Sequence, residues 1–196
     1  MNYRTPLVRR APVELSELDE PGLKELAEEI LRPYFHIEKE VVGVFKEGQP
    51  NVKIDYLLKP GAELVESGFV DQWIGLEVKA LNDSDSKKHA LAYAHQCICY
   101  SIAEFTALRD TCRIECVRPA FVVMFLPFRQ VFEEDNRYMD LWDSFLMRFN
   151  VGSLHVNHYR TYEWRMVFGG QSYYSNKYGL TNQPQAALKR RVGNSK

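Results

Sequence analysis

A short apolar stretch with two charges in its middle constrains the fold of this chain more than any other feature. The stretch WIGLEVKALN, residues 73–82, has the composition of a buried strand. Glu77 and Lys79 lie inside it, and burying either charge is costly unless that charge is paired or holds a metal ion. The chain must therefore place an ion pair or a bound cation inside its core.

A second apolar strand offers a matching acid. Residues 52–58, VKIDYLL, are typical of a strand, and side chains two apart along a strand share a face. This alternation predicts Ile54 and Tyr56 on one face and Asp55 on the other. Two neighbouring strands can thus present carboxylates to the same side of one sheet.

The two acids together suit a hard divalent cation. Carboxylate oxygens are ligands for Mg²⁺ or Mn²⁺ rather than for Zn²⁺, and a cation held by Asp55 and Glu77 would offset the cost of burying them. Lys79 beside it could activate a water molecule or stabilise a phosphate. The ordinary alternative is a salt bridge between Asp55 and Lys79, with Glu77 on a solvated face of the sheet.

Helices and strands alternate along the rest of the chain in a definite order. An apolar stripe with Asp19 as its N-cap and Pro21 early predicts the first helix. The expected elements are helices at 19–32, 87–109 and 136–149, strands at 35–46, 52–58, 73–80 and 120–127, and a hairpin of residues 154–159 with 162–168. The core order is α-β-β-β-α-β.

The long helix carries a polar stripe. His89, Tyr93, Gln96 and Tyr100 recur at helical spacing, and a largely separate apolar stripe can pack on the sheet. Gln96 can then donate to a phosphate or a water molecule, and either tyrosine can stack on a base. The apolar stripe consists of Leu91, Ala94, Ile98, Ile102 and Phe105.

Basic residues at the start of that helix are candidates for contact with nucleic acid. Lys87, Lys88 and His89 can bind phosphates, with Tyr93 beside them. The net charge of −1 argues against a protein that coats nucleic acid without specificity, but it allows a local basic groove.

These residues resemble the motifs of the PD-(D/E)XK nuclease superfamily, in its RecB-like and phage-exonuclease branch. Asp55 matches the first acid, Glu77 and Lys79 match the E-x-K, and Gln96 and Tyr100 match the Q-x-x-x-Y of the following helix. The resemblance covers residues 19–127, about half the chain. Asp55 follows an isoleucine where the motif nominally has a proline.

The resemblance implies a fold and a set of roles. The fold would be α/β, with a restriction-endonuclease-like αβββαβ core, a mixed sheet flanked by helices, and a C-terminal helix and β-hairpin added. Asp55 and Glu77 would bind Mg²⁺ or Mn²⁺, and the Val78 carbonyl would complete the metal site. Lys79 would be catalytic, with Gln96 and Tyr100 acting on the substrate.

The family often has another acid on its first helix, which should lie in phase with the apolar stripe. At about 100° per residue, Asp19 and Glu20 fall within the stripe, and Glu25, Glu28 and Glu29 fall outside it. We favour Glu20 as a further metal ligand, and the choice among these five acids stays open. The alternative is that Glu20 only complements the helix dipole.

Length and composition are typical of one domain. The chain has 196 residues and 45% hydrophobic content, and we expect an arm over 1–18, a nuclease-like domain over 19–168 and a flexible basic tail over 169–196. The sequence contains no run of about 18 apolar residues that would predict a membrane span. The start lacks the apolar segment of a signal peptide, so we expect a cytoplasmic protein.

The main functional hypothesis is an Mg²⁺-dependent deoxyribonuclease of phage, recombination or repair type. The alternatives are a catalytically silent protein of the same fold that binds DNA or a protein partner, and a ribonuclease. A protein partner would belong to a replication or recombination complex. The sequence leaves open exonuclease or endonuclease action, polarity, sequence preference and oligomeric state.

Overall fold

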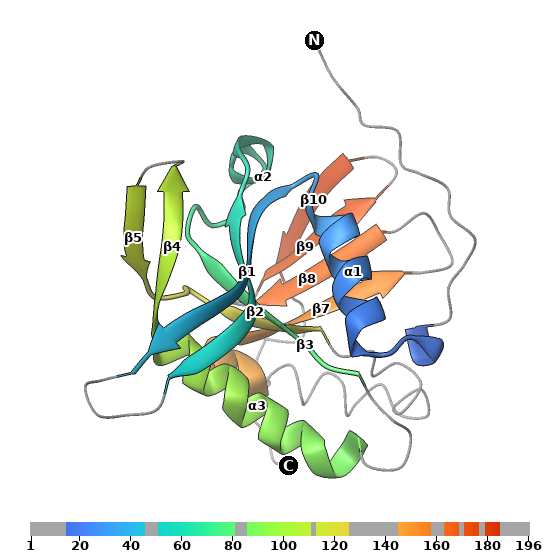
Figure 1. Cartoon of the computed structure of the whole chain (residues 1–196). Coiled ribbons are helices and arrows are strands. Elements are labelled where there is room, and N and C mark those ends of the chain that lie inside the picture. The colour runs from blue at the N-terminus through green and yellow to red at the C-terminus, as the bar shows by residue number, and fades with distance from the viewer. Residues whose placement is uncertain are drawn as a thin grey trace, which may run out of the picture.

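A computed structural model describes most of the chain (Figure 1), namely residues 15–45, 51–80, 86–110, 113–125, 145–157, 163–168, 171–176 and 179–184. The helices are α1 (Glu20–Leu31), α2 (Ala62–Glu66) and α3 (Ser86–Ile102), with short 3-10 helices η1 (Leu15–Glu17) and η2 (Met147–Phe149). The strands are β1 (Phe35–Val44), β2 (Val52–Pro60), β3 (Ile74–Val78), β4 (Glu104–Asp110), β5 (Arg113–Val117), β6 (Val122–Phe125), β7 (Val151–Asn157), β8 (Glu163–Phe168), β9 (Gln171–Asn176) and β10 (Gly179–Pro184).

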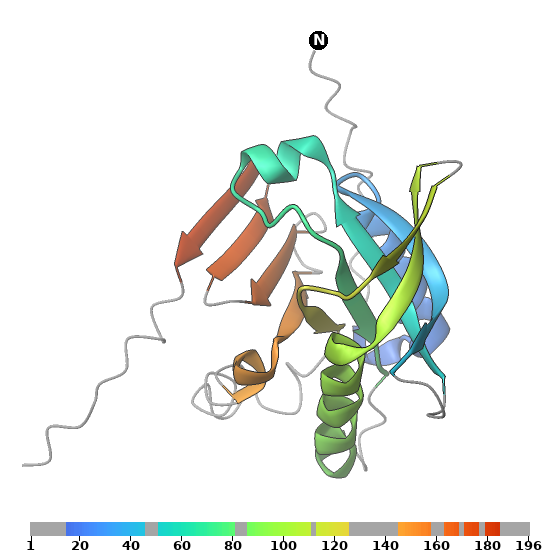
Figure 2. The ribbon, with the colours of Figure 1, turned by 90° about the vertical axis from the view of Figure 1, so that its left-hand side faces the viewer.

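The described strands form one mixed sheet of ten strands, in the order β10-β9-β8-β7-β6-β3-β2-β1-β4-β5. Only β3 with β6 and β6 with β7 run parallel, and the other pairs are antiparallel. Helices α1 and α3 cover opposite faces of this sheet (Figure 2). The predicted α/β class, with a mixed sheet between helices, is confirmed.

Two apolar clusters, one on each face, hold the layers together. The first joins Leu23 and Ala27 of α1 to the sheet, and the second joins Ala94 and Cys97 of α3 to the other face. In β3 the alternation holds as predicted, because the buried Leu76 packs in the first cluster and its neighbour Glu77 points to the α3 side. The capping of α1 by Asp19, which accepts the Gly22 N–H, is also confirmed.

The alternation of β2 breaks at Asp55. Ile54 packs in the α3-side cluster and Tyr56 in the α1-side cluster, so the prediction that they share a face is wrong. The pairs Lys39–Tyr56 and Val41–Ile54 leave Glu40 across from Asp55, and Glu40 has a left-handed φ of 53°. Regular alternation needs regular extended backbone, and this part of the ladder is not regular.

The long helix is shorter than predicted. It ends at Ile102, and residues 104–110 form β4, where buried Phe105 and Ala107 alternate with exposed neighbours. That period of two belongs to a strand, although Phe105 also fits a helical stripe. Leu91 and Ile102 of the predicted apolar stripe are 65% and 56% exposed. The buried face of α3 keeps Ala94 of that stripe but also includes Cys97 and Tyr100, so it is rotated from the predicted one.

The C-terminal part departs from the prediction beyond residue 168. The hairpin is confirmed, because β7 pairs with β8 in antiparallel register. The expectation of a flexible tail from 169 is wrong for 171–176 and 179–184, since β9 and β10 extend the sheet from β8. Their polar composition concealed strands whose stability comes from backbone pairing.

Other predicted segments fall partly or wholly outside the described residues. They are most of the arm over 1–18, residues 136–144 of the predicted late helix, and the basic end over 185–196. Among the described residues, none of the helices combines the length and apolar character that crossing a bilayer requires.

Candidate active site

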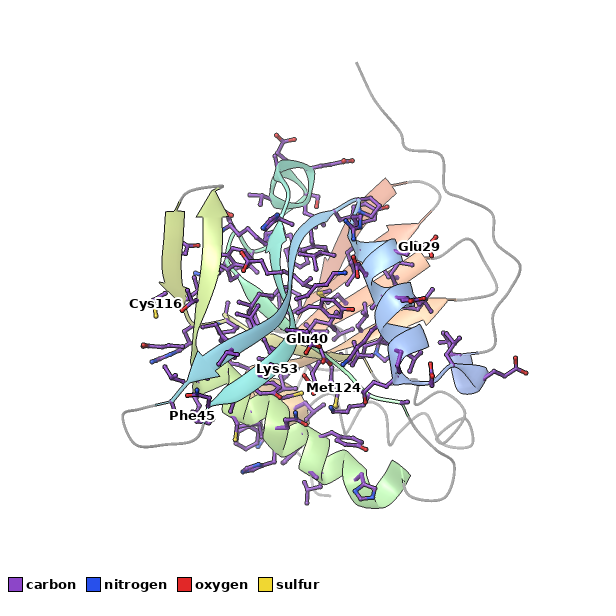
Figure 3. The ribbon with its side chains drawn as sticks, in the orientation of Figure 1. Glu29, Glu40, Phe45, Lys53, Cys116 and Met124 are labelled. Carbon is purple, nitrogen blue, oxygen red and sulfur yellow. The ribbon has the colours of Figure 1, made fainter. Side chains whose placement is uncertain are left out.

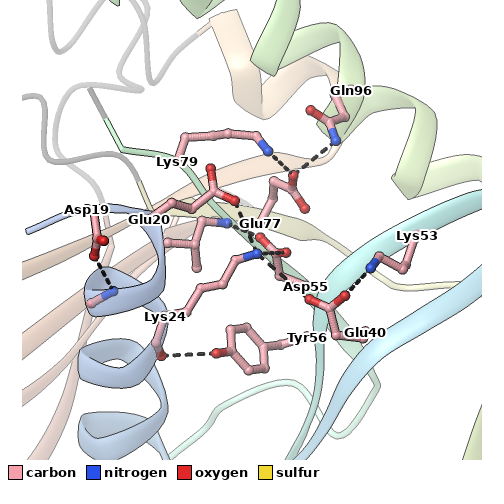
Figure 4. A network of polar contacts seen from close by, with 12 residues as sticks. Asp19, Glu20, Lys24, Glu40, Lys53, Asp55, Tyr56, Glu77, Lys79 and Gln96 are labelled. Atoms are coloured by element: carbon pink, nitrogen blue, oxygen red, sulfur yellow. Dashed lines mark hydrogen bonds and ion pairs between the residues drawn. The ribbon is translucent and has the colours of Figure 1, made fainter. Parts of the chain in front are cut away.

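Glu77 is the most deeply buried acid of the described residues, with 2% of its surface exposed. Its Oε1 accepts hydrogen bonds from Lys79 Nζ at 2.6 Å and from Gln96 Nε2 at 3.0 Å (Figure 4). Its Oε2 is buried and has no hydrogen-bond partner. Burial, reinforced by the negative charge of Asp55 and opposed by Lys79, raises the pKa of Glu77 to about 7. A buried carboxylate oxygen of this kind is costly unless a cation or a proton satisfies it.

Asp55 connects β2 to β3 through its side chain. The β2–β3 ladder ends at the Tyr56–Leu76 pair, and beyond it the Val78 N–H donates to Asp55 Oδ2 at 2.8 Å. The other oxygen, Oδ1, lies 2.6 Å from Lys24 Nζ. The structure therefore brings Asp55 and Glu77 to neighbouring positions on adjacent strands. The prediction that both carboxylates lie on the same side of the sheet is not confirmed, because Asp55 contacts Lys24 of α1 and Glu77 contacts Gln96 of α3.

Lys79 lies between Glu77 and an aromatic ring. Its ammonium pairs with Glu77 and lies 5.7 Å from the ring centroid of Tyr93. Burial lowers the pKa of Lys79, but the hydrogen bond and charge of Glu77 outweigh this effect and raise it, so the side chain stays protonated. The alternative of an Asp55–Lys79 salt bridge beside a solvated Glu77 is wrong, since Asp55 pairs with Lys24 and Glu77 is buried.

Gln96 and Tyr100 link α3 to both acid-bearing strands. The amide of Gln96 donates to Glu77 Oε1 and to the Tyr100 hydroxyl, which in turn donates to the Lys53 carbonyl of β2 at 2.7 Å. Tyr100 is only 3% exposed and packs in the α3-side cluster, and its contact with a substrate stays a prediction. Burial, then the charge of Glu77, raises its pKa. Tyr100 is a core residue that holds Gln96, and Gln96 holds Glu77.

The candidate nucleic-acid contacts are only partly described. His89 is exposed and Tyr93 is half-buried, with their ring centroids 6.1 Å apart. Lys87 and Lys88 belong to the first turn of α3, but their side chains lie outside the described residues. Of the two candidates whose side chains are described, Tyr93 lies directly beside Lys79 of the acidic centre.

Among the first-helix acids, Glu20 is linked to the centre through Lys24. Its Oε1 lies 3.1 Å from Lys24 Nζ, which also contacts Asp55. Asp19 caps the helix instead. Glu25 is exposed, and Glu28 pairs with Arg32 and Lys39. The choice of Glu20 is supported by position, although its carboxylate reaches the centre through a lysine.

Sequence reasoning missed Lys24 and Glu40. Lys24 lies one turn after Glu20, so the phase argument that selected Glu20 also points Lys24 toward the sheet. Glu40 pairs with Lys53, its neighbour in Figure 3, and lies 3.8 Å from Lys24 Nζ. Nothing local in the sequence marks Glu40, because its position depends on a left-handed residue within a strand.

The donor set fits a hard cation. The N–H and C=O of one strand residue point to the same edge, so the Val78 carbonyl faces Asp55 together with its N–H. Mg²⁺ and Mn²⁺ bind oxygen donors such as that carbonyl and the carboxylates of Asp55 and Glu77. The Oε2 of Glu77 has no hydrogen-bond partner. Within the described part of the chain, no group of three or more His, Cys, Asp or Glu side chains forms a ready-made metal cage.

No protein-family model, curated protein or solved structure matches the chain significantly.

Proposed function

We propose that the chain is a metal-dependent nuclease that hydrolyses phosphodiester bonds of DNA. The observation that carries the proposal is the buried Glu77 carboxylate, which has one free oxygen, a charged lysine beside it and Asp55 on the neighbouring strand. The element order α1, β1, β2, β3, α3 and β6, with α2 and the β4–β5 pair inserted, supports the restriction-endonuclease-like core that the motifs imply. We propose the phage-exonuclease, recombination and repair class because Gln96 and Tyr100 match the helix motif of that branch.

In this proposal each residue of the centre has a separate role. Asp55, Glu77 and the Val78 carbonyl would hold Mg²⁺ or Mn²⁺, and Glu20 would support them from α1. Such a cation polarises a phosphate and makes a bound water molecule more acidic. Lys79 keeps its protons, so it acts as a hydrogen-bond donor to the attacking water or to a phosphate oxygen rather than as a base.

A second candidate is a catalytically silent protein of the same fold that binds DNA or a protein of a replication or recombination complex. One observation favours it: the Lys24 ammonium already neutralises Asp55, as it would in a site without chemistry. The same observation is also compatible with an enzyme whose lysine yields to a cation.

The decisive experiment is incubation of the purified chain with end-labelled linear DNA, circular DNA and RNA, with Mn²⁺ or with EDTA. We expect Mn²⁺-dependent cleavage of linear DNA. Cleavage of the circles as well would assign an endonuclease, and cleavage restricted to RNA would assign a ribonuclease. Binding of DNA without any cleavage in Mn²⁺ would favour the silent alternative.

Gln96 and Tyr100 should separate activity from stability. Gln96→Leu removes the donor that positions Glu77 and should slow single-turnover cleavage about tenfold, which corresponds to about 1.4 kcal/mol. Tyr100→Phe removes the hydroxyl bound to the Lys53 carbonyl and should cost about 0.5–1.5 kcal/mol of stability.

The two variants are compared by thermal melting and by cleavage rate per folded molecule. Tyr100→Phe should melt lower than wild type and lose less activity than Gln96→Leu, because Gln96 keeps its own hydrogen bond to Glu77. A Tyr100→Phe variant that cleaves more slowly than Gln96→Leu would mean that the hydroxyl acts on the substrate.

A further inference from the structure

The ammonium of Lys24 lies among three carboxylates that come from three different elements. Its Nζ is 2.6 Å from Asp55 Oδ1 on β2, 3.1 Å from Glu20 Oε1 on α1 and 3.8 Å from Glu40 Oε1 on β1 (Figure 4). The Tyr56 hydroxyl donates to the Lys24 carbonyl at 3.0 Å and fixes this turn of α1 against β2. The lysine is therefore built into the acidic centre and is not a surface cation that happens to be nearby.

The contacts of Asp55 leave little room for a divalent cation beside the Lys24 ammonium. Its Oδ2 is already bound to the Val78 N–H, and its Oδ1 is bound to Lys24. A divalent cation shared with Glu77 would bind most readily at Oδ1, which is the Asp55 oxygen that is not tied to the backbone. A divalent cation and an ammonium at the same oxygen would repel each other strongly at this short distance.

From these contacts we infer that Lys24 is an internal counter-ion that competes with the divalent cation for Asp55. The inference rests on the proposed metal site. Without a divalent cation, the Lys24 ammonium neutralises Asp55 and occupies the oxygen at which the cation would bind. When the cation binds, the ammonium leaves Oδ1 and stays paired with Glu20 and Glu40, which already lie within reach.

The geometry supports a displaceable lysine. The Lys24 side chain is 25% exposed, so its end can move toward solvent without crossing the apolar core. Glu20 is on the same helix one turn earlier, which gives the displaced ammonium a partner at helical spacing. The cost of releasing Asp55 should then appear as weaker binding of the cation by the wild-type chain.

The test is a calorimetric titration of Mn²⁺ into metal-free protein. Lys24→Met keeps the aliphatic stem but removes the charge, and Lys24→Gln can still donate to Asp55 without charge. If Asp55 is free of the lysine in about a tenth of wild-type molecules, both variants should bind Mn²⁺ about tenfold more tightly. Lys24→Gln keeps the experiment decisive if Lys24→Met fails to fold.

The matched control is Lys39→Met. Its ammonium pairs with Glu28 at 2.5 Å, so this variant makes the same change in net charge without touching Asp55. Its Mn²⁺ affinity should stay close to that of wild type. A tenfold gain in both Lys24 variants, absent from the control, supports the inference.

Two results would overturn it, and they differ in meaning. If wild type binds Mn²⁺ and the Lys24 variants bind it equally or less tightly, Lys24 does not compete and the metal site itself stands. If neither wild type nor the Lys24 variants bind Mn²⁺, the inference and the proposed metal site fail together.

Discussion

Glu77→Gln should lower the single-turnover rate of DNA cleavage in Mn²⁺ by about a thousandfold or more, because a bound cation supplies several kcal/mol of transition-state stabilisation. Asp55→Asn should have an effect of the same order, since it removes the negative charge of the second proposed ligand, on the neighbouring strand. Lys79→Met should also be severely impaired, but for a different reason: it removes the proposed donor to the reacting groups and leaves both carboxylates in place. The measurement is cleavage of labelled linear DNA with enzyme in excess.

Glu104→Gln is the matched control for this series. It makes the same chemical change at a carboxylate on β4 that pairs with Arg118 and has 48% of its side chain exposed. It should cleave like wild type. If Glu77→Gln cleaves as fast as Glu104→Gln, the buried carboxylate has no part in the reaction.

The metal-free protein should lose stability as the pH rises, and Glu77 should be a main cause. Its pKa is about 7 in the folded chain, against an ordinary value of 4.5. Between these values the folded state keeps a proton that the unfolded state has released, so rising pH favours unfolding. The full difference is at most roughly 3 to 4 kcal/mol, at about 1.4 kcal/mol for each pKa unit.

This prediction is checked by urea unfolding in EDTA, from about pH 5 to about pH 8, with wild type beside Glu77→Gln. Glutamine cannot titrate, so the difference between the two profiles isolates Glu77 from other ionisable groups. The difference should change across this range and level off above the folded pKa. Parallel profiles would show that the pKa of Glu77 is the same in the folded and unfolded chain, and therefore that Lys79 and its other partners fully offset the cost of burying its charge.

The parts of the site carried by local patterns could be predicted from the sequence. Strand β3 places Glu77 on the α3 side because alternation along a short, regular strand depends only on neighbouring residues. Gln96 reaches Glu77 for a similar reason, since helical spacing fixes which side chains share a face. Asp55 and Glu77 meet because their strands are adjacent in the sheet.

The parts that depend on tertiary structure could not be predicted. The face of Ile54 changes where the backbone of Glu40 is left-handed, and no local preference of a glutamate indicates that conformation. The hydrogen bond from the Tyr100 hydroxyl to the Lys53 carbonyl depends on how α3 packs against β2, so helical spacing alone does not indicate it. Lys24 was missed because its role depends on acids from three elements meeting at one point.

The sheet is larger than the sequence predicts, because strand pairing rather than local composition decides whether residues 104–110, 171–176 and 179–184 form strands. Residues 104–110 contain apolar positions that suit either a helix or a strand, and pairing with β1 and β5 selects the strand. Strands β9 and β10 have polar sequences, and their neighbours in the sheet supply the hydrogen bonds that stabilise them.

The central claim is that the buried carboxylate of Glu77 and the carboxylate of Asp55 bind one divalent cation, and a calorimetric Mn²⁺ titration tests it most directly. Wild type and Lys79→Met, which keeps both acids, should bind Mn²⁺ with a stoichiometry of about one, as expected for a single shared site. Glu77→Gln and Asp55→Asn should lose that binding while remaining folded. Unchanged Mn²⁺ binding by Glu77→Gln would contradict the account, because the free oxygen on which it rests would then not be a ligand.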